Sequence, residues 1–133
     1  MIESVQRFFD ARPESVGQAR EFASTTLVGW NLAERIDDIR LCVSELATNA
    51  LVHGTVADHG FLVRLDAEDD VVRLEVHDSR RRRPETRQAA DTDMSGRGLV
   101  LVAALADDWG LQDRTPLGKI VWSCFTAAAG APA

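Results

Sequence analysis

The sequence predicts an α+β fold: a two-layer sandwich in which a mixed or antiparallel sheet carries about three helices on one face. Residues 61–66 and 71–78 alternate apolar and polar side chains, as half-buried strands do. Residues 16–30 and 36–50 instead repeat apolar side chains at spacings of three and four, as amphipathic helices do. The resulting order is strand, two helices, hairpin, loop, helix and hairpin. A doubly wound parallel sheet is excluded, because its helices would alternate with its strands.

The first third of the chain contributes one strand and two helices. Ser4–Phe9 is predicted to form the first strand, and Pro13 and Glu14 fit the first turn of a helix that ends near residue 30. A second helix is expected from about Ala33 to His53. Its buried stripe should contain Ile36, Ile39, Val43, Leu46 and Ala50.

The middle of the chain is predicted to be a hairpin followed by a loop. The strands Phe61–Asp66 and Val71–Asp78 flank an acidic turn at residues 68–70. Residues 79–95 are polar, rich in arginine and interrupted by Pro84, which indicates a loop. A loop of this length in a small domain is typical of a lid or a binding segment.

The last third is predicted to be a helix and a second hairpin. The helix should begin at Gly98 and bury Leu99, Val102, Ala103 and Ala106 on one side. The strands Asp108–Asp113 and Lys119–Thr126 should then surround a turn at residues 116–118. We expect the small-residue tail, 127–133, to be frayed.

Length and composition indicate one soluble domain, residues 1–133. Of the 133 residues, 45% are hydrophobic and 27% charged, as in ordinary globular proteins. The formal charge of −6 argues against broad binding to nucleic acid or membrane surfaces. We see no apolar run of about 20 residues and no signal-peptide pattern, so we expect a cytoplasmic protein. Cys42 and Cys124 lie in apolar segments without metal-like spacing, which favours reduced core thiols.

A carboxylate and a carboxamide, Glu45 and Asn49, lie four residues apart in the second predicted helix. At that spacing both side chains project from one face of the helix, off the main apolar stripe. They can simply form a polar edge where the helix leaves the core. Alternatively, the amide oxygen can bind Mg²⁺, and the carboxylate can orient or deprotonate an attacking hydroxyl.

Asp78 is the last residue of a predicted strand. By alternation it points to the same side as Leu74 and Val76, so a buried face would leave its carboxylate in need of a partner. The exocyclic amine of adenine would be such a partner. An aspartate that merely starts a turn at a strand end is the simpler alternative.

Gly96, Arg97 and Gly98 stand where a loop meets a helix. Glycines allow a close approach of the backbone, and the start of a helix carries partial positive charge, which suits phosphate. Upstream, Arg80–Arg83 is a run of four arginines in an acidic chain. This run is either a solvated loop or a basic segment that contacts phosphates or an acidic partner.

In this order the motifs resemble those of the Bergerat-fold ATP-binding superfamily, which includes histidine kinases, DNA gyrase, ninety-kilodalton heat-shock chaperones and mismatch-repair ATPases. Glu45–Ala50 is similar to its N box, Asp78 to the adenine-binding aspartate of its first glycine box, and Gly96–Leu99 to its second. Within that superfamily the chain resembles the short bacterial anti-sigma-factor serine kinases. Val43–Ala50, Gly98–Val102 and Gly118–Trp122 carry this resemblance, which extends over about residues 5–126.

The resemblance implies a set of roles and partners. Asn49 would be the Mg²⁺ ligand, Glu45 the general base acting on a serine hydroxyl, and Asp78 the receiver of the adenine amine. Gly96, Arg97, Gly98 and Leu99 would border the ATP phosphates, and residues 79–95 would form the lid. The substrate serine would belong to an anti-anti-sigma antagonist protein, and a sigma factor would be the competing partner. Members of the family often form homodimers.

One departure from the superfamily pattern separates two functions. The pattern places glycines at positions 80 and 82, where this chain has Arg80 and Arg82. We therefore expect either an ATP- and Mg²⁺-dependent serine/threonine kinase that also binds a sigma factor, or a catalytically silent module that binds a sigma factor or antagonist. The detached catalytic half of a histidine kinase is disfavoured, because we find no dimerisation helix with a phosphorylatable histidine.

Overall fold

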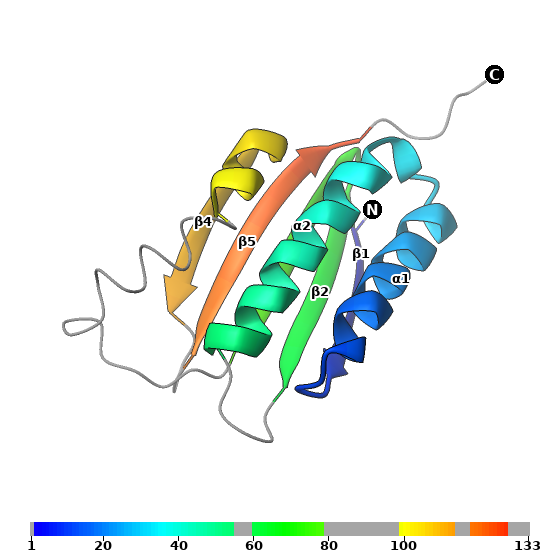
Figure 1. Cartoon of the computed structure of the whole chain (residues 1–133). Helices are drawn as coiled ribbons and strands as arrows, with labels where there is room; N and C mark the ends of the chain where they lie inside the picture. The colour runs from blue at the N-terminus through cyan, green and yellow to red at the C-terminus, as the bar shows by residue number, and fades with distance from the viewer. Residues whose placement is uncertain (1, 55–59, 79–98, 114–117, 128–133) are drawn as a thin grey trace.

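The computed structural model describes residues 2–54, 60–78, 99–113 and 118–127, which form one sheet with helices on one face (Figure 1). The sheet contains β1 (Ile2–Phe9), β2 (Phe61–Glu68), β3 (Val71–Asp78), β4 (Asp108–Asp113) and β5 (Lys119–Thr126). Its strand order is β1-β2-β3-β5-β4, and every neighbouring pair is antiparallel. The helices α1 (Glu14–Gly29) and α2 (Ile36–Asn49) and the helical residues 99–105 cover it. The predicted α+β sandwich is confirmed, with an antiparallel sheet.

The core lies between the helices and one side of the sheet. Residues directly opposite in an antiparallel pair point to the same side, and the apolar residues of β2 and β3 are paired in this way. The sheet contributes Phe9, Phe61, Val63, Leu65, Val72, Leu74, Val76, Val121 and Phe125, all buried. The helices contribute Ala19, Ala23, Leu27, Ile39, Val43 and Leu46, also buried. Burial of this apolar surface is the main force that holds the two layers together.

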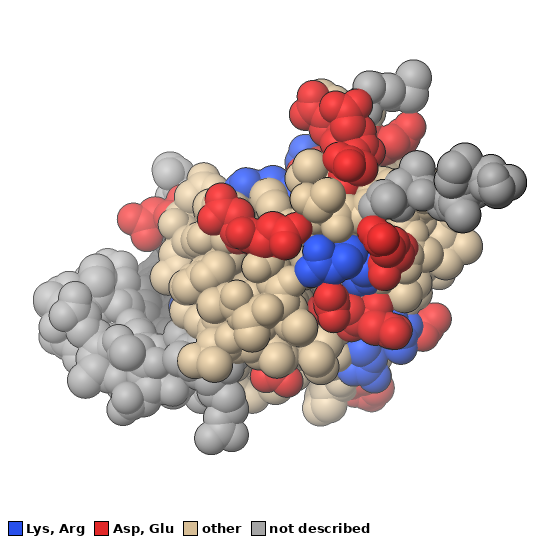
Figure 2. Space-filling view, turned by 90° about the horizontal axis from the view of Figure 1, so that it is seen from above, with Lys and Arg blue, Asp and Glu red and all other residues tan. Residues whose placement is uncertain are grey.

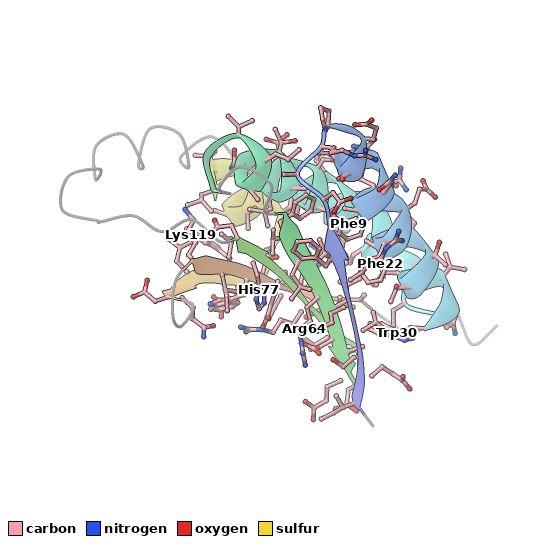
Figure 3. All side chains as sticks on the ribbon, turned by 90° about the horizontal axis from the view of Figure 1, so that it is seen from below. Phe9, Phe22, Trp30, Arg64, His77 and Lys119 are labelled. Carbon is pink, nitrogen blue, oxygen red and sulfur yellow. The ribbon has the colours of Figure 1, made fainter. Side chains whose placement is uncertain are left out.

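The opposite side of the sheet carries polar side chains that pair with one another. Arg73 Nε donates to Glu75 at 2.8 Å, and the His77 ring nitrogen lies 2.8 Å from the same carboxylate. Arg73 also lies over the Trp122 ring, 4.6 Å from its centroid. Figure 3 shows His77 and Arg64 on this side, away from the helices. Paired charges of this kind allow one face of an antiparallel sheet to remain uncovered.

The boundaries of α1 agree with the sequence prediction, but the second helix is not one continuous α-helix. A 3₁₀ turn, η1 (Ala33–Arg35), precedes α2, and a π-helical turn, η2 (Ala50–Gly54), follows it. Asn31 adopts a φ of 61° between α1 and η1. Asparagine tolerates this left-handed conformation better than most residues, so the chain can reverse there without glycine.

Arg35 connects three parts of the fold. Its Nε donates to Asp38 at 3.0 Å, and its Nη1 donates to Asp107 at 3.3 Å and to the Thr126 carbonyl at 3.2 Å. Its Nη2 donates to the carbonyl of Leu105, the last helical residue of 99–105. The start of α2 is therefore tied to the end of β5 and to the end of the helical residues 99–105.

Both strands of the second hairpin have the predicted bounds, whereas some side chains near it differ from the prediction. Ala103 is exposed, and Leu105 instead packs against the core. Ala127, expected in a frayed tail, is buried, and its N–H donates to the Asp70 carbonyl at 2.7 Å. The predicted loop 79–95, residues 116 and 117 of the predicted turn and the rest of the tail lie outside the described residues. Among the helices described, none is long and apolar enough to cross a membrane.

Candidate functional site

Glu45 and Asn49 lie along the edge of the buried stripe of α2. Ile39, Val43 and Leu46 of that stripe are buried, while Glu45 and Asn49 are both half-buried. Four residues apart in one α-helix, the two side chains share a face, as predicted. Both therefore remain accessible to a ligand, although a simple polar edge of the helix would have the same exposure.

The helix changes its hydrogen-bonding pattern at Asn49, its last α-helical residue. The next five residues form the π-helical turn η2, whose first residue, Ala50, is buried. π-Helical turns widen the helix locally and occur frequently at functional sites. The sequence periodicity did not reveal this turn, because one extra residue in a single turn hardly changes a hydrophobic pattern.

Asp78 is buried on the helix-covered side of the sheet. It is 5% exposed and continues the face of Leu74 and Val76, so the alternation predicted for this strand is confirmed. Its Oδ1 accepts the backbone N–H of Lys119 at 3.0 Å. A buried carboxylate needs such donors, because an uncompensated buried charge is costly. The hydrogen bond joins the last residue of β3 to the first residue of β5 and fixes the position of that carboxylate.

The structure brings Asn49 and Asp78 to the same end of the molecule. Both α2 and η2 pack against β3. Figure 1 shows the C-terminal end of α2 and the start of β5 together at the lower end of the view. Since Lys119, at the start of β5, pairs directly with Asp78, this carboxylate also lies at that end. Glu45 is one helical turn further from it.

Lys119 also lies at this end of the molecule, although the sequence favoured an ordinary exposed lysine over one that reaches a phosphate. Its side chain is half-buried and points to the helix-covered side of the sheet, where Figure 3 labels it. The cross-strand pairing with Asp78 places it beside the candidate site. Alternation in residues 119–126 could have indicated this orientation, but only the register of β3 with β5 shows which residue it faces.

The end opposite the candidate site is acidic. Figure 2, which looks onto the upper end of Figure 1, shows more acidic than basic side chains there. Among the exposed acidic residues are Asp37 in the first turn of α2 and Asp69 and Asp70 in the turn between β2 and β3. A polyanionic ligand is repelled by such a surface, so this end is an unfavourable place for phosphates.

Neither cysteine contributes a reactive thiol to this site. Burial raises the pKa of the Cys42 thiol to about 12, and the nearby carboxylates of Asp38 and Glu45 add to that effect. The thiol stays neutral near pH 7 and is a poor nucleophile. Cys42 is therefore the core thiol that was predicted. Cys124 was predicted wrongly: it is half-buried on the uncovered face of the sheet rather than in the core.

Of the residues predicted to border the phosphates, the structure describes only Leu99. It is half-buried and packs against the core at the start of the described helical residues 99–105. Gly96, Arg97 and Gly98 lie outside the described residues, as do Arg80–Arg83 and Pro84. Leu105, at the other end of 99–105, is tied to Arg35 beside the start of α2. Leu105 therefore lies at the end of the molecule opposite Asp78.

Comparisons with known proteins agree with this architecture. A solved structure described as full-length ShkA in complex with AMPPNP matches with a TM-score of 0.57 and 23% sequence identity. The match covers 95% of this chain and 32% of the ShkA chain, so this chain spans about a third of that protein. None of the curated proteins matches significantly. The model of the histidine kinase-like ATPase domain family matches residues 9–125, nearly the whole chain. The protein therefore belongs to the histidine kinase-like ATPase domain family, whose Bergerat fold it adopts.

Proposed function

We propose that this protein binds ATP with Mg²⁺ and acts as a serine/threonine kinase of the anti-sigma-factor type. The observation that carries the proposal is the buried Asp78 carboxylate at the end of β3, held by the Lys119 N–H at 3.0 Å. Asn49 lies at the same end of the molecule, and Glu45 lies one turn before it on the same helix face. Membership of the ATPase-domain family supports nucleotide binding at this end.

Asp78 suits the adenine ring. A buried carboxylate accepts hydrogen bonds only, and the exocyclic amine of adenine is a donor, whereas guanine presents a carbonyl oxygen at the equivalent position. Leu74 and Val76, on the same side of β3, are buried in the core, so the carboxylate continues an apolar face. The ShkA structure is a complex with AMPPNP, an adenine nucleotide, which supports an adenine nucleotide as the proposed ligand.

Asn49 and Glu45 suit the phosphate end of the nucleotide. The neutral amide oxygen of Asn49 is a hard ligand for Mg²⁺, which keeps most of its remaining positions for water and phosphate oxygens. When bound, Mg²⁺–ATP would supply the phosphoryl group and neutralise its charge. Glu45 is half-buried and accessible, so its carboxylate can orient the acceptor hydroxyl and take its proton. Gly96, Arg97, Gly98 and Leu99 are proposed to border the phosphates on sequence resemblance alone.

The proposed protein substrate is an anti-anti-sigma antagonist whose serine accepts the phosphate, and the proposed competing partner is a sigma factor. These partners follow from the resemblance of Val43–Ala50 and Gly118–Trp122 to the anti-sigma-factor kinases. We propose a cytoplasmic location, where such partners occur. Direct binding to nucleic acid is not part of the proposal, because the formal charge of the chain is −6.

A second candidate is a catalytically silent module that binds a sigma factor or antagonist. Arg80 and Arg82 favour it, because they replace the glycines that let a backbone approach the nucleotide closely. A module of this kind would bind its protein partner with the same affinity in the presence and absence of ATP.

Calorimetric titration with ATP and with GTP, each with and without Mg²⁺, tests the nucleotide site. We expect Mg²⁺-dependent binding of ATP and much weaker binding of GTP. Asp78→Asn should weaken ATP by roughly ten- to hundredfold, because hydrogen bonds to a charged acceptor are the stronger kind. Asp66→Asn is the matched control, since Asp66 is half-buried on the uncovered face of the sheet. Equal affinity for ATP and GTP, or equal effects of the two variants, would contradict the Asp78 assignment.

Asn49→Ala tests the metal assignment in the same titration. We expect the variant to lose the Mg²⁺-dependent part of ATP affinity and to keep its fold, because Asn49 is half-buried at the end of α2. Thr48→Ala, which removes an exposed polar group from the preceding position, is the control. An Asn49→Ala variant that still responds to Mg²⁺ like the wild type would exclude this ligand.

Phosphotransfer separates the two candidate functions. The purified protein is incubated with γ-labelled ATP and each anti-anti-sigma protein of its source genome. A kinase transfers label to serine, and Glu45→Ala abolishes the transfer while leaving ATP affinity near the wild-type value. ATP binding without any transfer, together with tight partner binding that survives Asn49→Ala, identifies the silent module.

A further inference from the structure

Lysine is nearly absent from this chain, and its one occurrence lies beside Asp78. Among the 15 lysines and arginines, Lys119 is the only lysine. As the first residue of β5 it lies directly opposite Asp78 of β3, and its backbone N–H donates to Asp78 Oδ1 at 3.0 Å. The residue that holds the proposed adenine-binding carboxylate therefore also carries a cationic side chain, which the proposed function does not use.

The side chain of Lys119 lies on the same side of the sheet as the Asp78 carboxylate. Residues directly opposite in an antiparallel pair point to the same side, with their Cβ atoms about 5 Å apart. Figure 3 shows Lys119 on the helix-covered side. The four-carbon stem of lysine can span such a separation. A group that is hydrogen-bonded to Asp78 therefore lies within reach of the Lys119 ammonium.

Two aspartates are the cross-strand neighbours of Lys119, Asp78 on β3 and Asp113 on β4. A cross-strand ion pair is the simplest role for a lysine in this position. However, none of the ion pairs within the described ranges involves the Lys119 ammonium. The side chain is also half-buried, whereas lysine is mostly exposed in folded proteins. The ammonium can therefore contact a bound ligand without breaking an ion pair of this part of the structure.

The edge of adenine is complementary to a carboxylate and an ammonium that lie side by side. Its exocyclic amine donates hydrogen bonds, and the ring nitrogens on either side of the amine, N1 and N7, accept them. A carboxylate accepts hydrogen bonds only, and an ammonium donates them only. A base whose amine lies against Asp78 therefore has an acceptor nitrogen next to that contact, where Lys119 can donate to it.

Contact with the phosphates is the competing role for this lysine, since an ammonium is a common phosphate ligand. The proposed phosphate end of the nucleotide lies at Asn49 and Glu45 on α2. Lys119 instead donates its backbone N–H to Asp78, the residue proposed for the adenine end. The position of Lys119 therefore favours the base over the phosphates.

We propose that the Lys119 ammonium donates a hydrogen bond to a ring nitrogen of adenine, N1 or N7, next to the exocyclic amine that donates to Asp78. The two residues then recognise two adjacent groups of the base, and Lys119 is a specificity-determining residue of the nucleotide site. The inference rests on the proposed function, because it requires a nucleotide whose adenine lies at Asp78. It adds a second contact to that assignment, one that depends on a ring nitrogen rather than on the amine.

Calorimetric titration with ATP, 1-deaza-ATP and 7-deaza-ATP tests this contact, because each analogue replaces one ring nitrogen by C–H. We expect the wild type to bind one of the two analogues roughly tenfold more weakly than ATP, since a hydrogen bond from a charged donor is lost. In Lys119→Met, which keeps the backbone N–H that donates to Asp78, the ratio of the two affinities should approach one. All three nucleotides carry the same phosphates, so the general loss of positive charge cancels in this ratio.

Two further variants serve as controls for the titration. Asp113→Asn changes the other cross-strand neighbour of Lys119, an exposed residue, and should leave the ratio at its wild-type value. Lys119→Arg keeps the charge and the donors and should keep part of the discrimination. A ratio that is the same in the wild type and in Lys119→Met, or a wild type that binds both analogues as tightly as ATP, would overturn the inference. If ATP binding still depends on Asp78 in that case, the proposed nucleotide site stands; if ATP does not bind at all, both are refuted.

Amine labelling of the wild type separates the base from the phosphates. Acetylation by acetic anhydride, measured at lysine by mass spectrometry, reports on Lys119 alone, because the chain has no other lysine. A saturating concentration of ATP with Mg²⁺ should slow this acetylation several-fold, whereas inorganic triphosphate with Mg²⁺ should not. Equal protection by triphosphate would assign the ammonium to the phosphates and overturn the inference, and so would the absence of protection by ATP.

Discussion

Removal of the Arg35 guanidinium should destabilise the fold strongly, although the residue lies at neither the site nor the centre of the core. Arg35 donates to the carbonyls of Leu105 and Thr126 and to the carboxylates of Asp38 and Asp107, and it lies over the Phe125 ring. Its side chain is 21% exposed, so most of these contacts are partly shielded from water. Arg35→Ala removes all of them at once.

The contacts allow an estimate of the cost. Each of the two carbonyl hydrogen bonds is worth about 1 kcal/mol, because water can partly replace the donor. The two ion pairs and the ring contact, half-exposed, contribute a few tenths each. We expect a loss of roughly 3 kcal/mol in the free energy of unfolding, which lowers the Tm of a chain of this size by about 10 °C. Arg35→Lys should recover part of the loss, since an ammonium keeps the charge but not the planar fork.

Urea unfolding followed by circular dichroism measures this loss. Arg40→Ala is the matched control: Arg40 reaches Glu21 at 3.4 Å and Ser24, and Glu21 is 72% exposed. Its cost should stay near 0.5 kcal/mol, as is typical of surface pairs. If Arg35→Ala unfolds within about 0.5 kcal/mol of the wild type, or costs no more than Arg40→Ala, the reasoning from these contacts is refuted.

Three further measurements test other parts of the structure. The backbone N–H of Thr126 and the Arg35 guanidinium lower the pKa of Asp107. Its charged form therefore stabilises the fold above the ordinary value of about 3.9, and this contribution is lost as the pH falls through the lower, folded-state pKa. Asp107→Asn should lower the free energy of unfolding by at most about 1 kcal/mol near pH 7, since the side chain is 51% exposed. In urea unfolding near pH 2 this difference from the wild type should vanish. A difference that grows toward low pH would contradict the expected sign. The Ser123 hydroxyl is buried without a hydrogen-bond partner among the described residues. Ser123→Ala should therefore leave the free energy of unfolding unchanged or raise it by about 1 kcal/mol. A clear fall in the Tm of this variant would reveal a partner. Alkylation with iodoacetamide should reach Cys124 first and Cys42 only after unfolding, because Cys42 is fully buried; equal rates in the native protein would contradict its placement.

The fold could be predicted because its elements repeat regularly. Alternation in Val71–Asp78 predicted both the strand and the buried side of Asp78, and the structure confirms both. The 3.6-residue period predicted α1 and the buried stripe of α2. The irregular turns at the two ends of α2 escaped prediction, since η1 and η2 differ from an α-helix in hydrogen bonding rather than in hydrophobic pattern.

The site could be predicted only in part, because its assembly depends on contacts between distant residues. Glu45 and Asn49 form a pair by local spacing alone, and their common helix face was predictable. The hydrogen bond from the Lys119 N–H to Asp78 depends on the register of β3 with β5, which no local pattern specifies. The same holds for Arg35, whose partners lie up to 91 residues away along the chain. The roles of Glu45, Asn49 and Asp78 in binding and catalysis stay predictions for the titrations described above.

The hydrogen bond between the Lys119 N–H and Asp78 also has a consequence for the entropy of binding. Because the carboxylate is buried and its Oδ1 is fixed by a main-chain donor, its rotamer freedom is lost when the chain folds. A ligand that contacts this carboxylate therefore meets an acceptor that is already oriented, and binding does not have to order it. The half-buried side chains of Asn49 and Glu45 retain more freedom, so immobilising a ligand's phosphate end should carry the larger entropic penalty. Calorimetry can compare ATP with adenosine, which lacks the phosphates. Adenosine should lose much of the unfavourable binding entropy but keep the favourable binding enthalpy of the adenine contact.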